Sequence, residues 1–328
     1  MNRVGAVCYS FQYCIGLFSY NKREGERMDV FGFVEATRDA GGECAQIFHS
    51  MIDNLSDSDL KRLNARGKDL DVLLEIHGGT ALRPDYEKTI HKAAAAGVKV
   101  LGCSFGMMMR PDKIATLKEW DAHMAKCRHR LKEIADIARP LGLTIGVENH
   151  LDFTIPELHD LIKNCDASNV GVILDVGNPI GTLDDPTEAA DLLGPYTVAT
   201  HYKDFAVEEV TRGFVLTMVP LGCGSLQLPE ITRRLVKHVP PDIGFAIEMM
   251  NGQQLKINWL EDRFWVPFRG ATAQQAAATL RHIRGKAIDI AEYLPVDEVD
   301  RLPHEAHLKL EKDRIARCIS HLKGLLAG

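Results

Sequence analysis

Four short segments decide the fold of this chain: Ile145-Gly146-Val147-Glu148-Asn149-His150, Val172-Ile173-Leu174-Asp175, Val198-Ala199-Thr200-His201 and Phe245-Ala246-Ile247-Glu248. Each has the pattern of a short apolar strand that ends in a residue able to bind a divalent metal. The gaps from 148 to 175 and from 175 to 201 are close to one strand-plus-helix unit of a (β/α)8 barrel, whose ~250 residues divide into eight units of about 30. Active sites of such barrels lie at the C-terminal ends of the strands, so these residues should converge at the barrel mouth.

Strand and helix patterns alternate along the whole chain, which favours an α/β fold with a parallel sheet. No G-x-G-x-x-G follows the first strand, so the usual mark of a dinucleotide-binding sheet is missing. The pattern therefore predicts a closed TIM barrel. We expect its eight strands at residues 4–9, 44–48, 71–76, 98–104, 143–147, 170–174, 197–201 and 243–249.

The domain organisation expected from the sequence is simple, because no repeat, low-complexity stretch or linker interrupts the chain. We predict one domain over residues 1–328, with the barrel at about 4–290 and a helical C-terminal extension at about 291–328. Two mouth insertions are expected, a β-hairpin at 205–226 after strand seven and an aromatic-rich loop at 251–270 after strand eight. Long loops at a barrel mouth are commonly functional.

Composition narrows the class of protein. Apolar residues make up 45% and charged residues 26%, as in ordinary globular proteins. The net charge of -6 disfavours a nucleic-acid partner, and no run reaches the ~18 apolar residues of a membrane span. The N-terminus has no signal-peptide layout. Eight scattered cysteines without a C-x-x-C pair are typical of a reducing compartment, so we expect a cytoplasmic protein.

The four strand-end residues form a plausible ligand set for one metal ion. Three carboxylates and one imidazole suit Mn²⁺, Mg²⁺, Co²⁺ or Zn²⁺, and a set without thiolate favours a catalytic site over a structural one. Any one of these residues could instead be a helix cap, an ion-pair partner or a satisfied core residue. Four such coincidences at four strand ends favour the metal site, with Mn²⁺ as the first expectation. The predicted metal ligands are Glu148, Asp175, His201 and Glu248.

Several motifs together resemble the xylose isomerase-like sugar phosphate isomerase/epimerase family over roughly residues 4–290. They are Val147-Glu148-Asn149-His150, Leu174-Asp175-Val176-Gly177-Asn178, His201-Tyr202-Lys203-Asp204, Ile247-Glu248 and the turn Pro220-Leu221-Gly222-Cys223-Gly224. The resemblance implies a TIM barrel with one divalent metal on the four ligands named above. Members related to ketose epimerases use the first and last Glu as an acid/base pair, which implies catalytic roles for Glu148 and Glu248.

The chain departs from the epimerase pattern at three places. Asn178 stands where epimerases have a substrate-binding His, and Lys203 lies in the segment where they have an Arg. His150 is an addition, and strand alternation puts it on the same side as Glu148. His150 is therefore a candidate general base. The alternative is that it only bonds Asp152 or a loop carbonyl.

Further candidate substrate contacts follow from position. Lys203 could stabilise an oxyanion or pair with Asp204. His49 and His77 end strands two and three and could bind sugar hydroxyls, although both could simply be polar strand ends. Trp265 could stack on a sugar or an aromatic aglycone, or anchor a hydrophobic lid. With Asn178, these residues complete the predicted substrate site.

The leading prediction is a metal-dependent isomerase or epimerase that removes a proton beside the carbonyl of a keto-sugar or polyol and passes through an enediolate. The first rival is a lyase or C-deglycosidase catalytic subunit that eliminates the aglycone of a 3-keto-glycoside, with His150 as base. An apurinic endonuclease would need more histidine ligands and a basic face. We expect a small sugar or glycoside as substrate and a homo-oligomer, or a hetero-oligomer with a small partner subunit.

Overall fold

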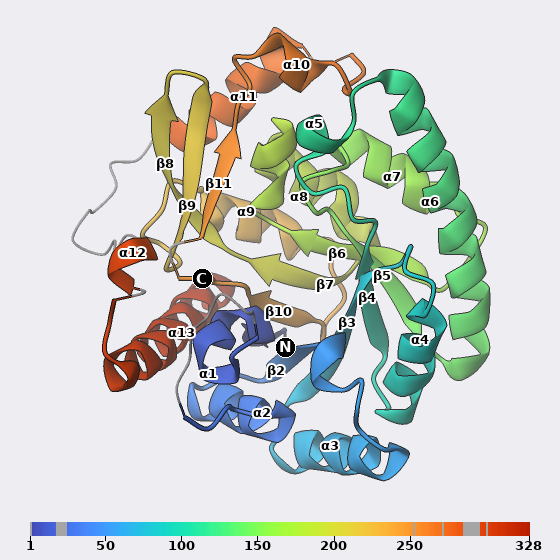
Figure 1. Cartoon of the computed structure of the whole chain (residues 1–328), viewed down its shortest axis with the longest axis vertical. Helices are drawn as coiled ribbons and strands as arrows, with labels where there is room; N and C mark the ends of the chain where they lie inside the picture. The colour runs from blue at the N-terminus through green and yellow to red at the C-terminus, as the bar shows by residue number, and fades with distance from the viewer. Residues whose placement is uncertain (1, 18–24, 252, 271, 285–295, 300) are drawn as a thin grey trace.

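The structure, a computed structural model, describes residues 2–17, 25–251, 253–270, 272–284, 296–299 and 301–328. Its centre is a closed barrel of parallel strands in the order β1-β10-β7-β6-β5-β4-β3-β2, surrounded by helices (Figure 1). This confirms the predicted TIM barrel. The eight strands are β1 (Arg3–Val7), β2 (Cys44–Phe48), β3 (Leu73–Thr80), β4 (Val100–Ser104), β5 (Thr144–Glu148), β6 (Val170–Asp175), β7 (Thr197–Tyr202) and β10 (Gly244–Ile247).

Amphipathic helices cover the outside of the barrel, and the N-termini of most of them are capped by local side chains. In α7, for example, Thr154 accepts from the backbone N–H of Glu157 while the Glu157 carboxylate accepts from that of Thr154. This reciprocal pairing satisfies two donors that the first helical turn would otherwise leave free. The ring consists of α2 (Val30–Asp39), α3 (Asp57–Asp69), α4 (Tyr86–Ala95), α6 (Leu117–Ala138), α7 (Ile155–Lys163), α8 (Pro186–Leu193), α9 (Leu228–Leu235) and α13 (His304–Ala327).

Further helices lie in the connections between these elements. They are η1 (Cys8–Phe11), α1 (Gln12–Ile15), η2 (His49–Met51), α5 (Arg110–Lys113), η3 (Arg139–Leu141), η4 (Asn178–Thr182), η5 (Gly194–Tyr196), α10 (Asp262–Trp265), α11 (Ala273–Arg284) and α12 (Val296–Val299). No helix of the described residues is both long enough and apolar enough to cross a membrane.

The two insertions join into one structure beside the barrel mouth. The hairpin predicted after strand seven is β8 (Asp204–Val210) and β9 (Gly213–Val219). The segment after β10 adds β11 (Gln254–Ile257), giving a three-stranded antiparallel sheet that stands beside the barrel at the upper left of Figure 1. The two loops predicted separately from the sequence are thus held to each other by backbone hydrogen bonds.

The C-terminal helix α13 packs against β1, β10 and α9, so it lies where the eighth helix of the barrel belongs (Figure 1). Its Glu311 is fully buried and accepts the backbone N–H groups of Tyr13 and Cys14 at 2.8 and 2.9 Å. This helix therefore covers the seam between the first and last strands. The predicted boundary between barrel and extension, at about residue 290, lies outside the described residues.

Candidate metal centre

The four predicted ligands lie together at the C-terminal ends of their strands. Glu148 and Asp175 end β5 and β6, His201 lies near the end of β7, and Glu248 directly follows β10. One ligand atom from each lies within 4.8 Å of the others, and all four side chains are buried. The register pairs His201 with Asp175 on one side and with Ala246 on the other. Because side chains alternate along a strand, Glu248, two residues after Ala246, faces the same interior.

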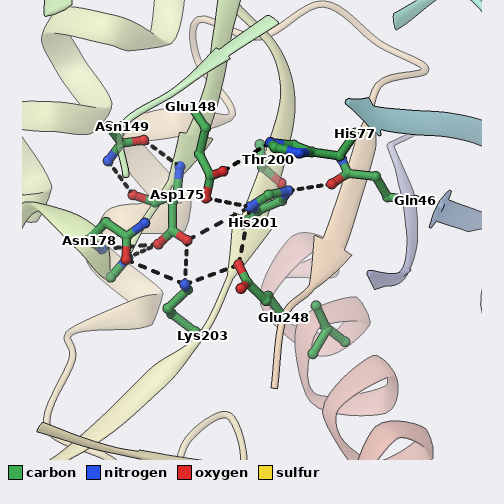
Figure 2. A network of polar contacts seen from close by, with 12 residues as sticks. Gln46, His77, Glu148, Asn149, Asp175, Asn178, Thr200, His201, Lys203 and Glu248 are labelled. Carbon is green, nitrogen blue, oxygen red and sulfur yellow. Dashed lines mark hydrogen bonds and ion pairs between the residues drawn. The ribbon is translucent and has the colours of Figure 1, made fainter. Parts of the chain in front are cut away.

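The imidazole of His201 stands at the centre of the group (Figure 2). Its Nδ1 atom lies 3.1 Å from Glu148 Oε1, 3.2 Å from Glu248 Oε2 and 3.8 Å from Asp175 Oδ2. Burial lowers the pKa of His201, but the charges and hydrogen bonds of the two glutamates outweigh burial and raise it to about 10. His201 Nδ1 therefore faces three carboxylates. A divalent cation that replaced the proton on this nitrogen would neutralise their charge.

Asp175 is fixed by contacts on both its backbone and its side chain. The amide of Asn149 donates to the carbonyl oxygen of Asp175 and accepts from its N–H, both at 2.8 Å. Its Oδ1 accepts from the N–H groups of Gly177 and Asn178 at 2.9 and 3.0 Å. Oδ2 is then the oxygen that faces the other ligands. Burial raises the pKa of this carboxyl to about 6, although the nearby Lys203 opposes the shift.

Lys203 is a buried cation inside the group. Its Nζ atom lies 2.7 Å from Asp175 Oδ2 and 3.0 Å from Glu248 Oε2. Burial lowers the pKa of Lys203, but the surrounding carboxylates outweigh burial and hold it above its ordinary value. Within the ligand group, the three carboxylates, this ammonium and one divalent cation sum to zero charge, which lowers the cost of burying them. The donor set therefore fits such an ion.

Asp204, the residue after Lys203, has a structural role in the neighbouring turn. Its carboxylate accepts the backbone N–H groups of Gly222, Gly224 and Leu226 at 3.0 to 3.1 Å. A Cβ at position 224 would lie 2.2 Å from Asp204 Oδ1, so only glycine allows this approach. The Pro-Leu-Gly-Cys-Gly turn thus uses its amides to hold Asp204.

Glu148 and Glu248 lie on opposite sides of His201 and differ in their other partners (Figure 2). His77 Nδ1 accepts from the N–H of Gly79, so its Nε2 carries the hydrogen and faces Glu148 Oε2 at 3.1 Å. Burial raises the pKa of Glu148, but the charges of His150 and His201 outweigh it and hold the pKa well below its usual range. Burial likewise opposes the effect of Lys203 and His201 on Glu248, whose pKa falls to about 2.

Comparison with known proteins identifies the family. The model of the xylose isomerase-like TIM barrel matches residues 34–284, which is most of the chain. The chain belongs to this family. No curated protein matches the chain in sequence.

Solved structures share the family fold at low sequence identity. A D-psicose 3-epimerase crystallised with D-fructose is 16% identical, with a TM-score of 0.62 over 99% of this chain and 100% of its own. The probable 3-DHS dehydratase AsbF from Bacillus anthracis is 16% identical, with a TM-score of 0.58 over 86% of this chain and 98% of its own. The IOLI protein, solved with a bound zinc atom, is 14% identical, with a TM-score of 0.56 over 85% of this chain and 96% of its own. These likenesses establish the fold.

Two of the positions that depart from the epimerase pattern lie beside the ligand group. Asn178 is buried in η4, where its Oδ1 accepts from Lys203 Nζ at 3.4 Å. His150 is half-buried, just beyond β5, and its charge contributes to the low pKa of Glu148. Asn178 Nδ2 and His150 Nδ1 are both buried without a hydrogen-bond partner among the described residues.

The remaining two predicted substrate contacts are His49 and Trp265. His49 begins η2, and its Nδ1 lies 2.9 Å from Asp53 Oδ2. Burial lowers the pKa of His49, against the effect of Asp53. Trp265 ends α10, donates from Nε1 to the carbonyl of Trp259 at 2.8 Å and lines a cavity of about 170 Å³ with Phe268. The side-chain hydrogen bonds of both residues are with their own loops, so their substrate roles stay predictions.

Three residues of the site were missed from the sequence. Asn149 clamps the backbone of Asp175, as described above. Gln46 in β2 and Glu75 in β3 are buried below the ligands, with Gln46 Oε1 2.6 Å from His201 Nε2. A polar residue in the middle of an apolar strand, as in Cys44-Ala-Gln-Ile-Phe and Leu73-Leu-Glu-Ile-His, is the signal that could have identified both.

Proposed function

We propose that this protein is a divalent-metal-dependent isomerase or epimerase that acts on a keto-sugar or a related polyol. The proposal rests on one observation. Two buried glutamates, Glu148 and Glu248, flank His201 Nδ1 from strands that β6 and β7 separate. Two carboxylates on different sides of one bound substrate can remove a proton from one face and return a proton to the other.

The four ligands Glu148, Asp175, His201 and Glu248 would hold the metal, with Mn²⁺ as the first choice. When bound, such an ion supplies Lewis-acid chemistry, because it polarises a carbonyl and acidifies the C–H next to it. Burial of all four ligands excludes bulk water, which strengthens every charge interaction in the site.

The surrounding residues would hold the two glutamates ionised and bind the substrate. His77 carries its hydrogen on Nε2 toward Glu148, and Lys203 contacts Glu248, so each glutamate has a donor that can hold it ionised. Asn178 Nδ2 is a buried donor that can bond a substrate oxygen. These roles, and the acid/base assignment of the glutamates, belong to the proposal.

The test is proton exchange observed by NMR. The Mn²⁺-loaded protein is incubated with a panel of ketoses in D₂O, and the sugars are then examined after removal of the metal. Deuterium at the carbon next to the carbonyl, together with a rearranged sugar, supports the proposal. Glu248→Gln should abolish exchange, whereas exposed Glu208→Gln in β8 serves as the control. If the wild-type protein is active and the variants Glu148→Gln and Glu248→Gln both retain full exchange, the acid/base assignment of the two glutamates is wrong.

A second candidate is a lyase that eliminates the aglycone from a 3-keto-glycoside. His150 Nδ1, which has no hydrogen-bond partner among the described residues, favours it, because histidine is a common general base. The same experiment with 3-keto-glycosides distinguishes the two. Release of the aglycone, lost in His150→Gln but retained in His91→Gln at an exposed position of α4, would make the protein a lyase.

A further inference from the structure

A chain of buried polar groups continues from His201 away from the ligands, into the lower layer of the barrel. Gln46 Oε1 lies 2.6 Å from His201 Nε2, and Gln46 Nε2 donates to Glu75 Oε2 at 3.1 Å. Gln46 and Glu75 are 1% and 2% exposed. Figure 2 shows Gln46 on the side of His201 opposite to Lys203. Neither residue belongs to the ligand group.

Glu75 is costly at this position, because a carboxyl group in a barrel interior needs donors. It accepts from the side chain of Gln46, and burial raises its pKa against the effects of Gln46, His201 and the backbone of Gly244. A Cβ at position 244 would lie 2.5 Å from Glu75 Oε1, so glycine is what lets the first residue of β10 approach the carboxylate. Glycine at the start of β10 therefore leaves room for the Glu75 carboxyl group inside the barrel.

The donor and acceptor roles along this chain have one consistent direction. Gln46 turns its NH₂ toward Glu75 and its oxygen toward His201, which is the orientation that a carboxylate at 75, able only to accept, selects. That oxygen also only accepts, so His201 must carry its hydrogen on Nε2 and present Nδ1 to the carboxylates. Hydrogen bonds to the far nitrogen of a metal-binding histidine commonly fix its tautomer in this way.

We infer that Glu75, acting through Gln46, is a positioning residue that sets the tautomer of His201 and so prepares Nδ1 for the metal. This inference rests on the proposed metal-dependent function. Glu75 touches neither substrate nor metal in this arrangement. Its contribution is the direction of the hydrogen-bond chain.

The variant Glu75→Gln keeps the shape of the side chain and reverses that direction. Its oxygen would take the place of Oε1 beside the backbone of Gly244, which leaves its NH₂ facing Gln46. Gln46 would then turn its oxygen toward residue 75 and its NH₂ toward His201, which moves the imidazole hydrogen to Nδ1. The double variant Gln46→Glu with Glu75→Gln restores the direction, because a carboxylate at 46 accepts from both neighbours.

The experiment is Mn²⁺ binding by isothermal titration calorimetry for the wild-type protein and both variants. Heteronuclear NMR of histidine nitrogens in the Zn²⁺-loaded proteins reports the tautomer. We expect Mn²⁺ affinity to fall roughly 10- to 100-fold in Glu75→Gln and to recover in the double variant, with unchanged circular dichroism throughout.

Equal Mn²⁺ affinity in wild type and Glu75→Gln would overturn the inference and leave the proposed function intact. A loss of affinity that the double variant does not recover would also overturn it, because the effect would then come from packing. Failure of the wild-type protein to bind Mn²⁺ or Zn²⁺ would overturn the proposed function itself, and the inference with it.

Discussion

Asp184 provides a quantitative test of how a buried carboxyl group changes the free energy of unfolding with pH. Its side chain lies just after η4 and is 8% exposed. Oδ2 accepts from the backbone N–H of Ile155 at 3.1 Å and from the hydroxyl of Thr182 at 2.7 Å. Burial raises the pKa of Asp184 from 3.8 to about 6, against the effect of these two hydrogen bonds.

The variant Asp184→Asn keeps an oxygen acceptor for both donors and removes the charge. The folded state binds the Asp184 proton more tightly than the unfolded state, so stability is lost as pH rises from about 4 to about 6. A tenfold change in proton affinity corresponds to about 1.4 kcal/mol, which makes the cost of ionised Asp184 about 3 kcal/mol at pH 7.5. At pH 5 the same relation gives about 1.5 kcal/mol.

Urea denaturation at pH 7.5 and pH 5 measures this difference. We expect Asp184→Asn to have the higher free energy of unfolding at both pH values, with the smaller advantage at pH 5. Asp69→Asn, at an exposed position in the last turn of α3, controls for the change in net charge. An advantage that is absent at pH 7.5, or that does not shrink at pH 5, would refute the reasoning.

Three further predictions concern the site and the mouth. Mn²⁺ at 100 times its dissociation constant should stabilise the fold by about 2.7 kcal/mol, seen as a higher melting temperature that EDTA reverses and Asp175→Asn abolishes. Asn149→Ala should weaken Mn²⁺ binding about tenfold in calorimetry, because it removes both hydrogen bonds to the Asp175 backbone. Arg110→Met should destabilise the protein by about 3–5 kcal/mol in urea, because it leaves Glu157 without the guanidinium 2.6 Å away; a loss below about 1 kcal/mol would contradict this.

The fold was predictable because hydrophobic pattern and turn residues specify a barrel strand by strand. Cys44–Phe48 was predicted at its observed bounds, and the other strands differ by a few residues at their ends. The convergence of the four candidate ligands was predictable for the same reason. A charged residue at the end of an apolar strand can be recognised locally, and the fold rule supplies the convergence.

Contacts between distant segments could not be predicted in this way. The pairing of β11 with β9 depends on two insertions meeting in space, and neither sequence contains the register. The link from His201 through Gln46 to Glu75 joins three strands whose neighbour relations appear only once the barrel is closed. Lys203 was predicted either to stabilise an oxyanion or to pair with Asp204. Its ion pair with Asp175 was not predicted.

The seam covered by α13 also bears on how this barrel forms. The strand pair Arg3 with Gly244 and the hydrogen bond from Tyr13 N–H to Glu311 join residues 241 and 298 positions apart. Closing loops of that length is entropically costly before any contact compensates, and topologies rich in such contacts fold slowly. We expect β1 to β7 to assemble first, through pairings between consecutive units. The last strand, β10, and the helix α13 would then close the ring onto β1.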